Sequence, residues 1–166
     1  MKIAFQGARG AYSEMALHEH FGKDVKTIGC DTFDDVFELV DNEEATYGFI
    51  PVENTIAGTV VENYDLLFAN EMFVIAEAYM PIRHTLLAKK GARLEDIREV
   101  ISHPMALKQC QTYIKSKNIK ILPTYDTAGA ALFVATGDRM DQAAIASELC
   151  AEIYDMEILE RNIQSN

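Results

Sequence analysis

Strand-like and helix-like segments alternate along the whole chain, and this alternation constrains the fold more than any other feature of the sequence. Short apolar runs, such as residues 3–5 and 47–52, are followed by segments whose apolar residues recur at helical spacing. One such segment carries apolar side chains at Phe33, Val36, Phe37 and Val40. Alternation of this kind is typical of mainly parallel sheets with helices on both faces, because a parallel crossover connection needs a helix. The sequence therefore predicts an α/β fold.

The expected elements fall into two series. The first series has strands at 3–5, 25–28 and 47–52, and helices at 15–21, 33–40 and 60–68. The second has strands at 99–102, 120–122 and 142–146, and helices at 105–115, 127–135 and 148–154. A long strand pattern at 72–79 is broken by Pro81 and resumes at 82–87. We therefore expect lobe one at 1–77, a hinge at 78–83 and lobe two at 84–166, with a ligand cleft between the lobes.

Charge and cysteine content exclude several classes of partner. Lys and Arg total 15 against 26 Asp and Glu, so the formal net charge is −11. This charge argues against a nucleic-acid partner and against an anionic membrane surface. Three widely spaced cysteines, Cys30, Cys110 and Cys150, form no metal-ligand pattern and are expected to be reduced thiols of a cytoplasmic protein. We expect no metal and no cofactor.

The stretch from Gly48 to Gly58 is the most informative candidate site. Its apolar run ends at Glu53 and Asn54, which places a carboxylate and a carboxamide at a predicted strand end. Open α/β sheets bind ligands at the carboxyl ends of their strands. Ordinary turn and cap chemistry also explains the same residues, so both interpretations stay open.

The turn between residues 7 and 13 is a second candidate. Its two glycines, Gly7 and Gly10, let backbone amides approach an anion, and Arg9 favours a carboxylate ligand. The spacing matches neither a dinucleotide fingerprint nor a P-loop, so we expect no nucleotide. The alternative is a glycine turn in which Ser13 caps the following helix.

Two further junctions between a strand and a helix carry polar side chains. Ser102, His103 and Gln109 follow one predicted strand, and Thr127 follows another beside Asp126. His103 permits acid or base chemistry but also suits a helix cap before a proline. Capping alone also explains Asp126 and Thr127. We expect these junctions to face one cleft.

Six motifs follow one another along the chain: AFQGARGAYSE at 4–14, PVEN at 51–54 with a glycine at 58, HTLL at 84–87, SHPMALKQC at 102–110, YDTAGAA at 125–131 and AAIAS at 143–147. Together, in this order, they resemble the prephenate dehydratase family. The chain departs from the family pattern at Met105, where Gln is common, and at Tyr125-Asp126, where Ser or Glu-Ser is common. The second departure leaves the role of Asp126 open.

The resemblance implies both a fold and a reaction. The fold is like that of the type-II periplasmic binding proteins, with two α/β lobes and the active site between them. The reaction is the decarboxylating dehydration of prephenate to phenylpyruvate in L-phenylalanine biosynthesis, with prephenate as the small-molecule partner. It needs a general acid near the ring hydroxyl and neutral donors for two carboxylates, and no cofactor or metal.

On this basis we expect Glu53, Asn54 and Gln109 to be catalytic. The expected substrate-binding residues are Ser13, Gly58, Thr59, Ser102, His103 and Thr127. In the family, an Asn-x-Thr-Arg-Phe segment with an essential Thr follows the stretch that resembles residues 160–166, and an ACT regulatory domain commonly follows later. We expect a chain truncated before this Thr, with low activity, that forms a homodimer or homotetramer. The alternative is a non-catalytic two-lobe module that binds or senses an aromatic or carboxylate ligand.

Overall fold

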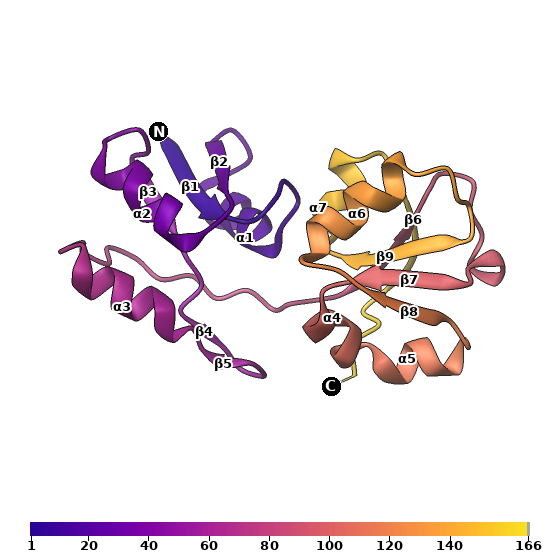
Figure 1. Ribbon diagram of the computed structural model, residues 1–166. Helices are drawn as coiled ribbons and strands as arrows, with labels where there is room; N and C mark the ends of the chain where they lie inside the picture. The colour runs from indigo at the N-terminus through magenta and orange to yellow at the C-terminus, as the bar shows by residue number, and fades with distance from the viewer. Residues whose placement is uncertain (166) are drawn as a thin grey trace. The chain divides into compact units, whose positions relative to one another are not determined.

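The computed structural model describes residues 1–165, which form two units (Figure 1). Unit 1 contains Met1–Ala8 and Tyr12–Met80, and unit 2 contains Arg9–Ala11 and the chain from Pro81 onward. Each unit has its own sheet, which confirms the predicted α/β fold. Among the described residues, no helix is long and apolar enough to cross a membrane.

Unit 1 is built on a parallel sheet with the strand order β2-β1-β3. The strands are β1 (Lys2–Gln6), β2 (Lys26–Cys30) and β3 (Tyr47–Phe49). Helices α1 (Tyr12–Phe21) and α2 (Phe33–Asp41) pack on opposite faces of this sheet. Phe49 meets Phe21 of α1 with ring centroids 6.3 Å apart, whereas a side chain at neighbouring Gly48 would meet Val36 of α2. The helices therefore cover both faces, as predicted.

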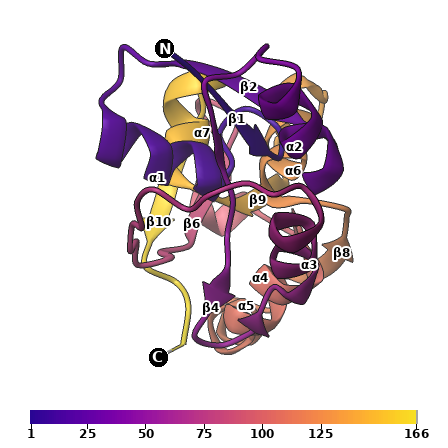
Figure 2. The same ribbon diagram turned by 90° about the vertical axis from the view of Figure 1, so that its left-hand side faces the viewer.

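The predicted strand at 47–52 is shorter in the structure, because β3 ends at Phe49. Pro51 has no N–H to donate to a sheet ladder, which explains the early end. The chain then forms a separate antiparallel hairpin of β4 (Glu53–Asn54) and β5 (Gly58–Thr59), followed by α3 (Val61–Ala69). This hairpin and α3 lie apart from the three-stranded sheet of unit 1 (Figures 1 and 2).

Unit 2 contains a five-stranded mixed sheet with the order β10-β6-β9-β7-β8. Its strands are β6 (Thr85–Ala88), β7 (Glu99–Ser102), β8 (Lys120–Pro123), β9 (Gln142–Ala146) and β10 (Glu157–Arg161). Strands β7, β8 and β9 are parallel, and β6 and β10 are antiparallel to their neighbours. A short 3₁₀ turn, η1 (Leu94–Asp96), precedes β7.

Helices cover both faces of this second sheet. On one face lie α6 (Thr127–Thr136) and α7 (Glu148–Ile153), and on the other lie α4 (Pro104–Gln109) and α5 (Gln111–Ser116) (Figure 1). The core between the sheet and α4 and α5 includes Leu86, Val100, Leu107, Cys110 and Ile114. The predicted helix at 105–115 is divided at Cys110, whose backbone angles of −98° and 10° leave the helical range.

Two segments differ from the sequence-based prediction. The strand predicted at 72–79 has no regular secondary structure, and its apolar side chains, such as Phe73 and Val74, are exposed. Only β6 forms in the predicted continuation at 82–87. Strand β10 was not predicted, because its sequence EILER lacks a clear alternation, and its pairing with β6 shifts register between Ile158 and Glu160.

Candidate active site

One edge of the sheet in unit 2 collects most of the polar residues that the sequence singled out there. Strands β7, β8 and β9 end at this edge, and the antiparallel strand β6 begins at it. The register aligns Ser102 with Pro123, and Thr85 with Ala146. We call this line of strand ends the carboxyl edge. Ligands of open α/β sheets bind outside strand ends of this kind.

Two serines at the carboxyl edge are fully buried, and their hydroxyls donate hydrogen bonds to backbone carbonyls. The Ser102 hydroxyl donates to the carbonyl oxygen of Ile145 at 2.5 Å, which joins β7 to β9. The Ser147 hydroxyl donates to the carbonyl oxygen of Gly10. Both hydroxyl protons are therefore committed to backbone acceptors. In this arrangement Ser102, a predicted substrate-binding residue, supports the edge from beneath.

The helix starts at the edge are capped by side chains. His103 Nδ1 accepts from the backbone N–H of Met105 at 3.1 Å at the start of α4. An accepting Nδ1 is unprotonated, so neutral His103 carries its proton on Nε2. Asp126 caps α6 by accepting from the N–H of Gly129, and Thr127 is the first, half-buried residue of that helix. Asp126 therefore acts as the N-cap of α6.

Gln109 stands at the carboxyl end of α4 and is paired with a buried histidine. Its side-chain oxygen lies 2.5 Å from Nε2 of His84, the residue that precedes β6. Burial lowers the pKa of His84, and the hydrogen bond to Gln109 opposes this shift only in part. His84 is therefore neutral at pH 7, and its ring donates Nε2–H to the Gln109 oxygen.

The last described residues, 163–165, form hydrogen bonds with both His84 and Gln109. The Ile163 N–H donates to the His84 carbonyl at 3.1 Å, and the Gln164 side-chain oxygen accepts from the His84 N–H at 2.8 Å. The Ser165 N–H donates to the Gln109 carbonyl at 2.8 Å. The segment 163–165 therefore crosses both members of the pair. We call His84, Gln109 and this segment the His84 network.

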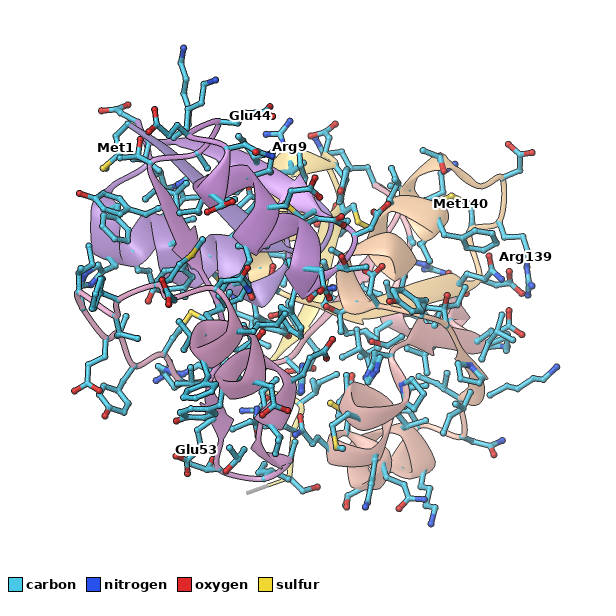
Figure 3. All side chains as sticks on the ribbon, turned by 60° about the vertical axis from the view of Figure 1, so that its left-hand side comes forward. Met1, Arg9, Glu44, Glu53, Arg139 and Met140 are labelled. Atoms are coloured by element: carbon cyan, nitrogen blue, oxygen red, sulfur yellow. The ribbon has the colours of Figure 1, made fainter. Side chains whose placement is uncertain are left out.

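Residues 9–11 of the glycine turn belong to unit 2 and pack against α7. The Tyr154 hydroxyl donates to the Arg9 carbonyl at 2.6 Å, and the Cys150 thiol lies 3.2 Å from the Gly10 carbonyl oxygen. Gly10 has a φ of +89°, and a Cβ there would lie 2.5 Å from the sulfur of Cys150. Segment 9–11 therefore acts as a strap held against α7, and the Arg9 side chain is exposed (Figure 3). Ser13 lies half-buried in the first turn of α1.

The predicted residues of unit 1 gather in the β4–β5 hairpin. Asn54 Oδ1 accepts from the N–H groups of Ile56 and Ala57 at 2.9 and 3.0 Å, which is the chemistry of an Asx turn. Gly58 supplies the positive φ of +89° that the turn needs. Glu53 is exposed at the rim of the unit (Figure 3), and so is its strand partner Thr59.

The structure therefore places eight of the nine predicted site residues in two groups, and Ser13, in α1, belongs to neither. One group is the hairpin with Glu53, Asn54, Gly58 and Thr59, and the other is the carboxyl edge with Ser102, His103, Gln109 and Thr127. His84 and Gln164 are not among the predicted site residues. Their contacts with Gln109 link positions far apart in sequence, which no local spacing reveals, although HTLL at 84–87 carries part of the family resemblance.

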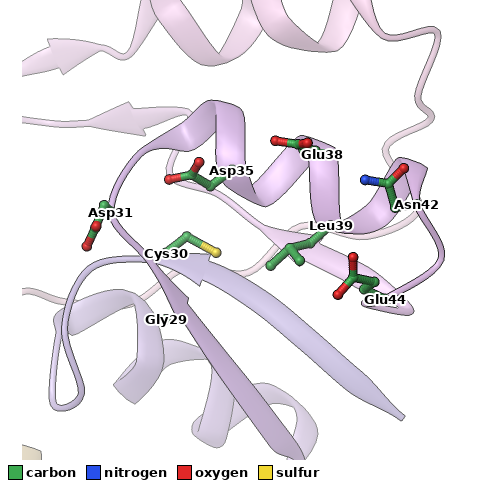
Figure 4. Close-up of a pocket in the computed structure, with 8 residues that line it drawn as sticks. All are labelled: Gly29, Cys30, Asp31, Asp35, Glu38, Leu39, Asn42 and Glu44. Atoms are coloured by element: carbon green, nitrogen blue, oxygen red, sulfur yellow. The ribbon is translucent and has the colours of Figure 1, made fainter.

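A depression of about 430 Å³ in unit 1 lies between β2 and α2 (Figure 4). Its lining includes four carboxylates, those of Asp31, Asp35, Glu38 and Glu44. These charges repel an anion, so the depression does not suit a dicarboxylate substrate. Within residues 1–165, no group of three or more His, Cys, Asp or Glu side chains is arranged to hold a metal ion.

Two cations of unit 2, Lys120 and Arg139, lie at the edge of the sheet opposite the carboxyl edge, where β7 begins. The buried carboxylate of Glu99, at the start of β7, accepts from Gln142 at 2.6 Å and from Arg139 at 3.1 Å. Lys120 lies 3.8 Å from the same carboxylate. Arg139 also forms paired contacts of 2.9 Å with Asp141, and the Arg139 side chain lies at the periphery of the unit (Figure 3). These cations serve an internal ion-pair network.

Comparison with curated proteins finds relatives along the whole chain. It is 37% identical to arogenate dehydratase/prephenate dehydratase 2, chloroplastic, of Arabidopsis thaliana, over 100% of this chain and 43% of that protein. It is 40% identical to arogenate dehydratase/prephenate dehydratase 6, chloroplastic, of the same plant, over 100% of this chain and 40% of that protein. The chain thus spans about two fifths of the length of the curated relatives it matches.

Solved structures with a similar fold were also found. Prephenate dehydratase from Arthrobacter aurescens, solved in complex with L-Phe, matches with a TM-score of 0.90 and 29% identity, over 100% of this chain and 56% of that one. GqqA, described as a novel type of quorum quenching acylase, matches with a TM-score of 0.94 and 34% identity, over 99% of this chain and 60% of that one. The prephenate dehydratase from Staphylococcus aureus shares the fold, with a TM-score of 0.81 and 22% identity over 100% of this chain and 62% of that one.

The family model for prephenate dehydratase matches residues 3–166, which is nearly the whole chain. The match includes every motif on which the resemblance rested. The chain belongs to the prephenate dehydratase family.

Proposed function

We propose that this chain provides the catalytic domain of a prephenate dehydratase, which converts prephenate to phenylpyruvate. The observation that carries the proposal is the family match over nearly the whole chain, which includes Gln109 and the other residues of the carboxyl edge. We propose Glu53, Asn54 and Gln109 as catalytic, and Ser13, Gly58, Thr59, His103 and Thr127 as substrate-binding. Ser102 belongs to the same proposed site, where its buried hydroxyl acts by joining β7 to β9 beneath the substrate.

The reaction defines what these residues must do. The ring carboxylate leaves as carbon dioxide, its electron pair completes the aromatic ring, and the ring hydroxyl departs. The departing oxygen takes up one proton and becomes water, so the prephenate dianion plus one proton gives the phenylpyruvate anion, carbon dioxide and water. Because aromatisation favours the products, the protein has to orient the two carboxylates and deliver that proton.

Gln109 is the best-placed neutral donor for a carboxylate. Its side-chain oxygen is held by His84, so its amino group is the end left to donate. An N–H that donates to a carboxylate makes a charge-assisted bond, which is stronger than a bond between neutral groups. Glu53 is exposed in its hairpin, so its carboxylate is accessible to a substrate.

Arogenate is a second candidate substrate, because the curated relatives are named for arogenate as well as prephenate. Arogenate carries an amino group where prephenate carries a ketone. The amino group of Gln109 can donate to a carboxylate or a ketone, whereas an ammonium group needs an acceptor. This difference favours prephenate, and the ratio of kcat/KM for the two substrates measures the preference.

Acyl cleavage, which the name of GqqA suggests for that protein, finds no activated nucleophile in four buried side chains of this chain. Acylases that form a covalent intermediate need an activated hydroxyl or thiol. Burial raises the pKa of Cys110 to about 12 and also raises that of Cys30. The buried Ser102 and Ser147 hydroxyls donate to backbone carbonyls.

We also propose a cytoplasmic location and a homodimer or homotetramer. The three cysteines support the first proposal, since all of them are buried thiols without a disulfide bond. The second rests on the family resemblance alone. Sedimentation velocity of the purified protein measures the oligomeric state.

Phenylpyruvate formation, followed by absorbance, tests the proposed function. Prephenate and arogenate are supplied separately to the 166-residue chain and to a version extended through Asn-x-Thr-Arg-Phe. We expect turnover of prephenate by the extended protein and much slower turnover by the 166-residue chain. Tight binding of prephenate by both proteins with no product would support the non-catalytic binding module instead. Equal rates for the two proteins would contradict the role of the Thr.

A further inference from the structure

We infer that His84 is a positioning residue, whose Nε2–H fixes which end of the Gln109 carboxamide is offered to the substrate. The inference rests on the proposed function, in which Gln109 contacts a carboxylate of the substrate. It assigns a role to a buried histidine that touches no reacting atom. The observation behind it is the short contact between two polar side chains, His84 Nε2 and Gln109 Oε1, at the carboxyl edge.

Both partners are fixed through their backbones. The His84 N–H and carbonyl are bonded to Gln164 and Ile163, and the Gln109 carbonyl is bonded to Ser165. Burial at 3% exposure removes water as a competing partner for the imidazole. The ring and the carboxamide therefore meet in one geometry.

The orientation of the Gln109 carboxamide follows from which nitrogen of the His84 ring carries the proton. With the proton on Nε2, the imidazole donates and must face the carboxamide oxygen, as observed. The amino group then points away from His84, and among residues 1–165 no acceptor is paired with it. With the proton on Nδ1, Nε2 would become an acceptor, the carboxamide would turn over and its oxygen would face the ligand. A carbonyl oxygen in that place repels a carboxylate, so only the first state suits an anionic substrate.

Packing alone is the competing explanation for His84, and two substitutions separate it from positioning. His84→Gln keeps an N–H donor the same number of bonds from Cα as Nε2. His84→Phe keeps a ring of similar size without any donor. Positioning predicts that the Gln variant retains function and the Phe variant loses it, whereas packing predicts the reverse order. Gln111→Leu, on the exposed first residue of α5, is the matched control for Gln109→Leu.

Nuclear magnetic resonance of the 166-residue chain, labelled with ¹⁵N in its histidines, tests the geometry without any assay of activity. The His84 signal is the one that disappears in His84→Gln. We expect the His84 proton to lie on Nε2 and to exchange slowly with water. This exchange should become fast in Gln109→Leu but not in Gln111→Leu. A proton on Nδ1, or a signal unchanged by Gln109→Leu, would overturn the inference.

Kinetics of the extended protein tests the consequence for the substrate. Loss of one hydrogen bond to a charged group lowers kcat/KM for prephenate roughly 10- to 100-fold, and we expect this for His84→Phe and for Gln109→Leu. We expect His84→Gln to stay within about threefold of the unaltered protein, since it restores the donor. The double variant should lose no more than Gln109→Leu alone, because both changes remove the same interaction. Multiplicative losses would overturn the inference.

The two proposals fail in different ways. If the unaltered extended protein turns over neither prephenate nor arogenate, the proposed function fails, and the role given to His84 in prephenate binding fails with it. If the unaltered protein is active and His84→Phe is equally active, only the positioning role is refuted. Thermal unfolding of each variant shows whether a loss of activity reflects a loss of folding.

Discussion

Replacement of Gly10 by alanine tests whether the strap, segment 9–11, packs against α7. Gly10 has a φ of +89°, and a Cβ there would lie 2.5 Å from the Cys150 sulfur and 3.3 Å from its Cα. An alanine in the left-handed region costs about 1–2 kcal/mol, and overpacking costs about 1–3 kcal/mol more. We therefore expect Gly10→Ala to lower the free energy of unfolding by about 2–5 kcal/mol.

Gly22→Ala is the matched control, because Gly22 has the same φ of +89° but no atom within 4 Å of the place that a methyl group would occupy. Both substitutions share the backbone strain and the change in unfolded-chain entropy, so their difference isolates the contact with Cys150. Urea unfolding followed by circular dichroism measures both, and Cys150→Ala should partly rescue Gly10→Ala. If Gly10→Ala costs no more than Gly22→Ala, the strap does not pack against α7 as described.

Three further predictions concern single side chains. Because burial lowers the pKa of His84, the unfolded chain binds its proton more readily than the folded chain, so stability is lost as the pH falls below about 6.5. His84→Gln should flatten this part of the curve of unfolding free energy against pH, and an unchanged slope would refute the assignment. Asn54→Ala removes two hydrogen bonds and should destabilise the β4–β5 hairpin by about 1–2 kcal/mol, seen as faster amide exchange at Ile56 and Ala57. Burial raises the pKa of Cys110 to about 12, so alkylation should reach it only after unfolding, and rapid labelling of the folded protein would contradict its burial.

Local patterns predicted most of the elements. Apolar runs correctly predicted β1, β7 and β9, and helical spacing of apolar residues correctly predicted α2 and α6, because the strands are covered by helices and the helices pack on a sheet. Pattern reasoning failed at 72–79, where an apolar run has no strand to pair with in the structure. It also failed at β10, whose place depends on pairing with β6, about 70 residues earlier in the chain.

The candidate site was predictable in composition but not in geometry. The sequence singled out Asn54, Gln109 and Asp126. In the structure, each of these side chains has a different kind of hydrogen-bond partner. Asn54 turns its oxygen into a local turn, and Asp126 caps α6. Gln109 is held by His84 and by Ser165, which lie 25 and 56 positions away in sequence. Contacts over such separations arise only when the sheet forms, so no motif could reveal them.

The rate of phenylpyruvate formation from prephenate tests the central claim most directly, when Gln109→Leu and Gln111→Leu are compared in the extended protein. We predict that Gln109→Leu lowers kcat/KM roughly 10- to 100-fold, as expected for a lost hydrogen bond to a charged group, and that Gln111→Leu leaves it unchanged. Equal activity of the two variants, with the unaltered protein active, would show that the carboxamide held by His84 does not meet the substrate.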